Sequence, residues 1–287
     1  MVFTREEYLI EISQRLKGMR NQEASHYVVP DYLAAEWQQR LRKATDAACP
    51  QNNISAIAWA SDDHESQINK LWCEKICEWC YQVVDHFDLN REVVSVAMSY
   101  RDRYLATHTI NRRIFQLAAM TALHLAIKLH EQGKLSMSSF IDLSRGYFME
   151  EHIVTMDEVM LQSLGWHVHP PTPLAFCRDF MRLVSGEIEP GARRDISELA
   201  RFMTELSVCS YWFSTKRPSS IALAAVISAI ELHGPCRVDP RYKAEFLTRV
   251  VDLGIDIACN DEVLACYERL RQMYDAGGYT PTFEDTP

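Results

Sequence analysis

The sequence predicts an all-α protein, and three observations support this fold class. Only 10 of the 287 residues are glycine, and runs of alternating β-branched residues are few. Apolar residues recur at every third or fourth position, which is the period of an amphipathic helix. Two stretches, 114–127 and 219–232, are apolar on almost every side, and this pattern indicates helices buried inside a core.

The first part of the chain predicts two helices ahead of a linker. Residues 4–23 form an amphipathic pattern, Pro30 interrupts it, and residues 31–44 resume it over a shorter length. Residues 49–66 mix polar and apolar side chains without a clear period, so we expect a linker there.

The remaining chain predicts two successive five-helix bundles, each around a buried central helix. A Leu-Ala-Ala triplet begins at Leu117 and again at Leu223, one in each central helix, and it indicates an internal repeat. We expect N-terminal helices and a linker over 1–66, the two bundles over 67–169 and 170–275, and a flexible tail over 276–287. The expected helices are 68–87, 92–105, 112–129, 136–144 and 149–164, closed by Gly165, and then 172–184, 192–213, 219–232, 241–253 and 261–274.

Composition argues against several classes of protein. The 39 acidic residues outnumber the 30 basic ones and give a net charge of −9, whereas a nucleic-acid-binding protein needs a concentrated basic surface. No apolar run reaches the ~18 residues of a membrane span, and the first residues are charged, unlike those of a signal peptide. Nine scattered cysteines fit free thiols in a reducing, intracellular compartment.

The sequence carries no motif that asks for catalysis. We find no glycine-rich phosphate loop, no G-x-S-x-G and no H-E-x-x-H, so we expect neither an enzyme nor a bound cofactor. Cys73, Cys77 and Cys80 share one helical face and, with His64 or His86, form a candidate zinc site. We favour a packed core instead, because structural zinc ligands usually lie on turns and free cysteine is commonly buried.

Several segments, in their order along the chain, resemble the cyclin family. They are Trp79, EVVSVAMSYRDRYL at 92–105, LAIKL at 125–129, MDEVML at 156–161, PTPLAF at 171–176 and LARFMTELSVCSYWFSTKRPSSIALAAVISAI at 199–230. The leader RLKGMRNQE…YVVPDYL makes the chain most similar to D-like cyclins of algal and diatom type. The resemblance implies a tandem cyclin fold with an additional N-terminal helix. It also implies a nuclear and cytoplasmic subunit that binds and activates a cyclin-dependent protein kinase in cell-cycle control.

In cyclins, a lysine and an acid at the positions of Lys128 and Asp157 pair with each other and face the kinase. The spacing alone favours a simpler interpretation, in which Lys128 extends to water and Asp157 is a solvated helix residue. The family's acid is usually glutamate, so aspartate shortens the reach by one methylene. The apolar kinase contacts that the resemblance implies are Leu117, Leu129, Leu161 and Trp166, with core packing as the alternative for Leu117 and Leu161.

Asp102 resembles an aspartate that cyclins use structurally, paired with an arginine early in the first helix of the bundle. That arginine's position is occupied here by Cys73. Asp102 therefore lacks its usual partner, and Lys75 and Arg103 are the two candidates to replace it.

Many cyclins also bind an Arg-x-Leu motif of their substrates in a groove on that first helix. Here Lys75 replaces an apolar residue, and Gln82 replaces an acid that would pair with the substrate arginine, so we expect a weakened or altered groove. An ordinary core aromatic is the alternative interpretation of Trp79. The positions that match the groove are Trp72, Ile76, Trp79, Gln82 and Gln116.

Two Thr-Pro pairs, at Thr280 and Thr286, lie in the expected tail. Cyclin-dependent kinases require proline after the threonine, so the bound kinase would phosphorylate its own subunit. A phosphate adds about −1.5 to −2 charges, and arginine-lined readers of ubiquitin ligases recognise such groups. We expect phosphorylation at these threonines and a ubiquitin ligase as a second partner, with an unmodified tail as the alternative.

Two other functions stay open at the level of the sequence. A transcription-factor-type tandem cyclin fold would bind promoter DNA through a basic face, which the net acidity argues against. An all-helical enzyme with an unrecognised site is the other alternative.

Overall fold

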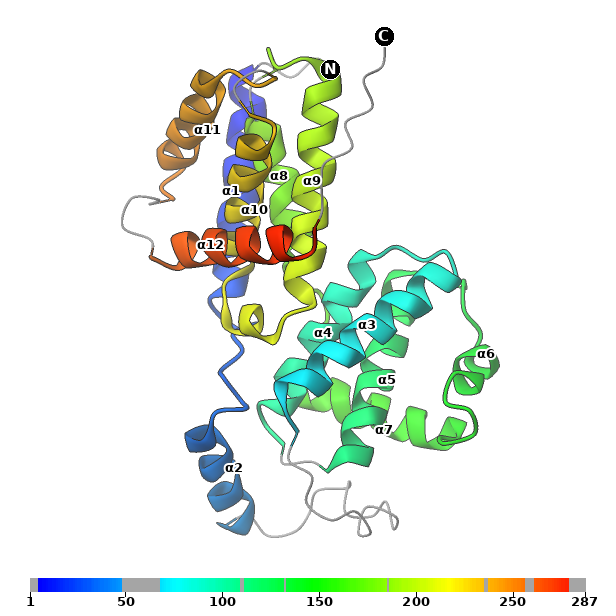
Figure 1. Cartoon of the computed structure of the whole chain (residues 1–287). Coiled ribbons are helices and arrows are strands. Elements are labelled where there is room, and N and C mark those ends of the chain that lie inside the picture. Colours follow the sequence, from blue (N-terminus) through cyan, green and yellow to red (C-terminus); the bar gives the residue numbers. More distant parts are fainter. Residues whose placement is uncertain are drawn as a thin grey trace. The chain divides into compact units, whose positions relative to one another are not determined.

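The computed structural model describes residues 5–47, 68–108, 111–131, 133–184, 186–234, 237–255 and 261–278. These residues form twelve α-helices and one 3-10 helix, with no β-strand among them (Figure 1). The all-α prediction is therefore confirmed. The chain divides into two compact units, which take the described residues of Met1–Ser25, Pro171–Ser207 and Lys216–Pro287 (unit 1) and of His26–Pro170 and Val208–Thr215 (unit 2).

Unit 2 is built around α5, as the apolar pattern predicted. Of the residues from Ile114 to Ile127, only Gln116 and His124 are not fully buried. Helix α5 packs against α4 on one side and α7 on another. The elements of unit 2 are α2 (Ala35–Ala47), α3 (Lys70–His86), α4 (Glu92–Leu105), α5 (Arg112–His130), α6 (Met137–Asp142), α7 (Glu150–Ser163) and the 3-10 helix η1 (Tyr211–Thr215).

Local sequence signals set the ends of these helices. The side chains of Asn69 and Asn111 accept hydrogen bonds from the first-turn amides of α3 and α5, which is the usual role of an N-cap residue. Gly165 follows α7 with a φ of 56°, as predicted for the residue after a helix end. The next residue, Trp166, also has a positive φ, of 62°, and its amide donates to the carbonyl of Leu161.

Unit 1 repeats the plan around α10, which is buried from Ser219 to Ile230. Helix α10 packs against α8 and α12, and α8 also contacts α1 and α11. Helix α1 belongs to this unit because Ile12 and Leu16 are buried in the same apolar cluster as α8 and α10. The elements of unit 1 are α1 (Arg5–Glu23), α8 (Pro173–Leu183), α9 (Pro190–Val208), α10 (Pro218–Leu232), α11 (Pro240–Asp252) and α12 (Asp261–Ala276).

One predicted helix was wrong in its length. The expected helix 192–213 ends at Val208, and a separate 3-10 helix follows. The Val208 carbonyl accepts a hydrogen bond from the Cys77 thiol at 3.3 Å, and the Tyr211 ring is buried in the core of unit 2. These tertiary contacts outweigh the local helical pattern, which by itself had no stop signal at this point.

The described part of the chain has no helix that is both long enough and apolar enough to cross a membrane.

Candidate functional site

Lys128 and Asp157 lie together in unit 2, where α5 packs against α7. The Lys128 Nζ is 3.6 Å from Asp157 Oδ2. The two side chains differ sharply in exposure, because 59% of the Lys128 side chain is accessible and only 7% of the Asp157 side chain. The site is therefore a buried carboxylate that holds a surface ammonium group at a defined position.

His124 is a third member of this site, and the sequence analysis did not identify it. It precedes Lys128 by one helical turn on α5, and its Nδ1 is 3.3 Å from Asp157 Oδ2. The His124 ring also lies 5.2 Å from the ring of Phe140, which is buried. The sequence signal was the four-residue spacing from Lys128, which places both side chains on one face of the helix.

The four predicted apolar contacts differ in their exposure. Trp166 is 68% exposed just beyond the end of α7, and Leu129 and Leu161 are half-buried. Leu117 has no accessible surface and packs inside the core. Trp166, Leu129 and Leu161 therefore present accessible apolar surface, whereas Leu117 is a core residue, as the alternative interpretation had it.

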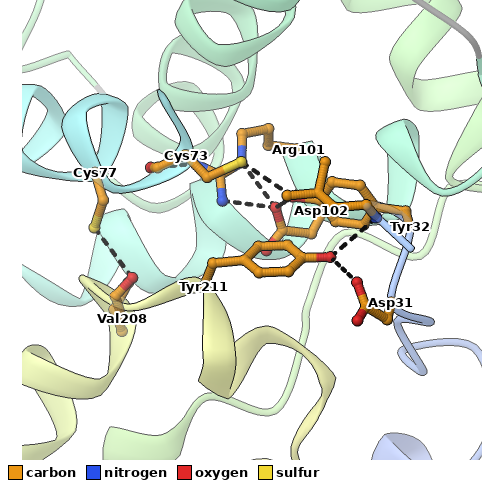
Figure 2. Close-up of polar contacts among 9 residues, drawn as sticks. Asp31, Tyr32, Cys73, Cys77, Arg101, Asp102, Val208 and Tyr211 are labelled. Carbon is orange, nitrogen blue, oxygen red and sulfur yellow. Dashed lines mark hydrogen bonds and ion pairs between the residues drawn. The ribbon is translucent and has the colours of Figure 1, made fainter. Parts of the chain in front are cut away.

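Asp102 forms an ion pair with Arg101, which was not one of the two partners expected from the sequence (Figure 2). The Arg101 Nη2 is 2.6 Å from Asp102 Oδ1, and the hydroxyl of Tyr32 donates to the same oxygen at 2.8 Å. The prediction of Lys75 or Arg103 was wrong, because Lys75 is exposed and Arg103 donates to the His167 carbonyl instead.

Arg101 also explains how Cys73 is tolerated on α3. Its Nη1 donates to the Cys73 carbonyl at 3.1 Å, so one guanidinium joins α3 to Asp102 on α4. Burial acts to lower the pKa of Arg101, but the Asp102 carboxylate outweighs it and raises that pKa well above its ordinary value. Burial, reinforced by the charge of Asp102, likewise raises the pKa of Tyr32. The group is therefore a fixed ion pair with a neutral phenol.

The same network fastens the leader segment to unit 2. The Tyr211 hydroxyl donates to Asp31 Oδ1 at 2.7 Å, and the amide of Leu33 donates to that hydroxyl at 3.2 Å (Figure 2). Just after the leader, the indole of Trp37 on α2 donates to the carbonyl of Ala106, which follows α4, at 2.9 Å. The leader that carries the D-like resemblance thus makes specific contacts with α4 and with η1.

Three of the predicted docking-groove residues line a common groove in unit 2. This groove has a volume of 620 Å³, and its lining includes Ile76 and Trp79 of α3 and Gln116 of α5. Within the described residues, Trp72 and Gln82 are not part of its lining: Trp72 is half-buried beneath Arg112, and Gln82 is exposed. The remaining lining residues, which the sequence analysis did not identify, are Arg112, Met120, Leu143, Ser144, Arg145, Tyr147 and Phe148.

The cysteines of α3 are core residues, as favoured from the sequence. Cys73, Cys77 and Cys80 are all buried, and burial raises the pKa of Cys80 to about 12, so this thiol is protonated near neutral pH. The described residues contain no group of three or more His, Cys, Asp or Glu side chains placed to hold a metal ion. His64 lies outside the described residues, as do Thr280 and Thr286 of the tail.

Two family models match the chain in succession. The cyclin N-terminal domain matches residues 19–169, and the cyclin C-terminal domain matches residues 171–279. The G2/mitotic-specific cyclin S13-6 of Glycine max is 29% identical over 202 residues, which are 64% of this chain and 43% of that protein. Cyclin-A1-2 of Arabidopsis thaliana is 26% identical over 224 residues, which are 75% of this chain and 50% of that protein. The matched segments thus span half or less of these relatives.

Solved structures resemble the chain over most of its length. A chain of the CAK complex from Chaetomium thermophilum, bound to ATP-gamma-S, aligns with a TM-score of 0.63 and 18% identity and covers 92% of this chain and 80% of that chain. A viral cyclin from herpesvirus saimiri aligns with a TM-score of 0.59 and 14% identity, covering 72% of this chain and 86% of that chain. At these identities the likeness shows a shared fold.

Proposed function

This chain belongs to the cyclin family, and we propose that it binds and activates a cyclin-dependent protein kinase in cell-cycle control, without catalytic activity of its own. The observation that carries the proposal is the ion pair between exposed Lys128 and buried Asp157. A surface ammonium group held by a buried carboxylate is suited to recognise an acceptor on a partner, and Trp166 of the same unit is exposed. Relatives named as mitotic cyclins support the cell-cycle assignment.

The physical mechanism is a shift between two states of the kinase. Catalysis by a protein kinase needs an ion pair between a lysine on its strand β3 and a glutamate on its helix αC. A partner that binds the catalytic position of that helix more tightly than the inactive position shifts the equilibrium by its difference in affinity. In this proposal Lys128 donates hydrogen bonds to the kinase, since an ammonium carries three N–H donors. Trp166 supplies an aromatic anchor of the kind that dominates interface energies.

The experiment compares wild-type protein with Lys128→Ala in capture of a kinase from cell extract and in activation of that kinase. We expect Lys128→Ala to reduce activation at least about ten-fold, because a hydrogen bond to a charged group contributes about 1.5–3 kcal/mol and 1.4 kcal/mol corresponds to a factor of ten. The melting temperature should hardly change, because an ion pair with an exposed lysine contributes at most about 1 kcal/mol.

Lys134→Ala is the matched control, because Lys134 is also an exposed lysine in an ion pair, with Glu131 at 2.6 Å. It should activate the kinase like the wild type. Equal activation by Lys128→Ala and wild type would contradict the proposed interface. Retention of promoter DNA in place of a kinase would favour the transcription-factor alternative.

The finer assignments belong to the same proposal. The D-like subtype is supported by the leader, in which Tyr32 donates a hydrogen bond to Asp102 of α4. A nuclear and cytoplasmic location follows from the kinase partner and is checked by fluorescence microscopy of the tagged chain.

Turnover through the tail is a separate proposal, with a ubiquitin ligase as the second partner. The two Thr-Pro pairs at Thr280 and Thr286 support it. A chase after protein synthesis is blocked should show a longer half-life for Thr280→Ala than for wild type. Unchanged half-lives for Thr280→Ala and for the double variant with Thr286→Ala would exclude the tail from degradation.

A further inference from the structure

We infer that the groove lined by Ile76, Trp79 and Gln116 binds an extended peptide in which an acidic side chain lies close to a bulky apolar one. The inference deepens the proposed function. A role of this groove in selecting kinase substrates rests on that proposed function. It reverses the charge that the resemblance to Arg-x-Leu-binding cyclins would imply. The observations that carry it are the chemistry of the groove's floor and the charges along its lining.

The floor of the groove is apolar. Met120 and Phe148 are only 6% and 3% exposed and close it from below, while Ile76, Trp79 and Leu143 are half-buried around it. Its volume of 620 Å³ lies within the range of about 300–1,000 Å³ that is usual for ligand sites. A bulky apolar side chain is therefore the part of a ligand that fills it.

Among the described residues that line the groove, the charged ones are all cationic. They are Arg112, at the start of α5, and Arg145, in the turn after α6. The Arg112 guanidinium lies 5.0 Å above the ring of Trp72, a cation–π contact that fixes its position. Neither arginine forms an ion pair with any carboxylate among the described residues. Both guanidinium groups are thus available to a ligand's carboxylate, which arginine can bind through two parallel hydrogen bonds.

The groove also lacks the group that an arginine-bearing ligand needs. Gln82 stands where an Arg-x-Leu-binding cyclin has an acid, and it is exposed outside the lining. A substrate arginine would therefore meet two like charges and no carboxylate among the lining residues. The protein as a whole carries a net charge of −9, so its overall field attracts basic peptides, and a preference for acidic ones must arise locally at this groove.

The test measures the binding of peptides to the full chain by fluorescence polarisation. The probes are fluorescein-labelled peptides that share a Leu-Phe pair and carry one variable residue, Asp, Gln or Arg, placed one, two or three positions before it. We expect the Asp peptide of the best spacing to bind about two- to five-fold more tightly than its Gln counterpart, because an exposed charge pair contributes up to about 1 kcal/mol. The Arg peptide should bind most weakly.

Two groove variants and one control sharpen the test. Arg145→Glu should reverse the order of the Asp and Arg peptides, and Arg112→Gln should reduce the preference for Asp. Arg91→Gln is the matched control, because Arg91 is also stacked on an aromatic ring, that of Tyr81 at 4.5 Å, but does not line the groove. Its peptide preference should equal that of the wild type.

Several outcomes would overturn the inference. They are an Arg peptide that binds as tightly as the Asp peptide, no binding by any peptide, and an order that Arg145→Glu leaves unchanged. A dimer of the chain in sedimentation that Arg145→Glu dissociates would overturn it as well, by making a second copy the occupant. No kinase is present in this measurement, so its failure leaves the proposed kinase activation standing, and loss of that activation leaves the peptide result standing.

Discussion

The central helices of the two units, α5 and α10, are alike inside and differ at their ends. Leu117 is the sixth residue of α5 and Leu223 is the sixth residue of α10, and both are followed by two buried alanines. The small side chains let the neighbouring helices pack closely on every side of the central helix. This shared interior explains why the same apolar pattern occurs twice along the chain.

The polar groups around α10 are used within unit 1. Glu23 of α1 accepts hydrogen bonds from the amide and the hydroxyl of Ser219 at the start of α10. At the other end, Glu231 accepts from Lys243 and from the hydroxyl of Tyr267. These contacts fasten α1, α11 and α12 to the central helix, so they act as internal braces.

The polar groups on α5 face the surface of unit 2 instead. Lys128 projects from its C-terminal part with Asp157 and His124 behind it, and Arg112 and Gln116 line the groove near its start. A buried central helix of one design thus carries polar groups that brace its own unit in α10 and that are accessible at the surface in α5, where we propose that they bind partners. The few polar residues at the ends of each helix set this difference.

The largest expected effect tests the shared interior. Leu117→Ala and Leu223→Ala should each destabilise their own unit by about 2–5 kcal/mol, because each removes a fully buried side chain from a packed core. Hydrogen exchange should show faster opening of α5 in the first variant and of α10 in the second. Similar exchange rates to wild type in either helix would contradict its central role.

A smaller effect tests the difference between the two helices. Lys128→Ala should lower kinase activation at least about ten-fold. Lys243→Ala, which removes the α11 lysine paired with Glu231 at the corresponding end of α10, should lower it less than about two-fold. The physical reason is that Lys243 binds Glu231 within unit 1. Kinase titrations with equal amounts of folded protein check this, and equal losses in the two variants would remove the distinction.

The smallest effect concerns the pH dependence of the brace at the start of α10. Burial raises the pKa of Glu23 above 4.5, although hydrogen bonds from Ser219 oppose it. Because the folded pKa lies above the unfolded one, the stability that this group contributes is complete below about pH 4.5 and is lost as pH rises through the folded pKa. Urea unfolding from pH 4.5 to 7.5 should therefore show Glu23→Gln gaining stability relative to wild type as pH rises.

Glu231→Gln provides a control of opposite sign. Burial would raise the pKa of Glu231, but hydrogen bonds from Lys243 and Tyr267 outweigh it, and the pKa lies below 4.5. Its contribution is present above the unfolded pKa and is lost as pH falls through the folded pKa. Glu231→Gln should accordingly lose stability relative to wild type as pH rises toward about 4.5, and the difference should be nearly constant at higher pH. The same trend in both variants would show that these carboxylates do not set the difference.

The sequence predicted regular elements better than their interruptions. Helix α4 was predicted at its observed bounds, 92–105, since its apolar period is continuous. The end of α9 at Val208 was missed, because it depends on the thiol of Cys77 and on the burial of Tyr211. A contact between residues so far apart in sequence leaves no local pattern to read.

By itself the sequence determined the all-α class, the two buried central helices and the membership of Lys128, Asp157, Ile76, Trp79 and Gln116 in candidate sites. Apolar periodicity and family motifs are properties of short segments, so they can be read without coordinates. Only the tertiary structure decided that Arg101 pairs with Asp102, that His124 joins Asp157, and that Arg112 and Arg145 line one groove. The physical reason is that the His124–Asp157 contact and the groove of Arg112 and Arg145 each join side chains from different elements. The Arg101–Asp102 ion pair forms only where α3, α4 and the leader bury it together.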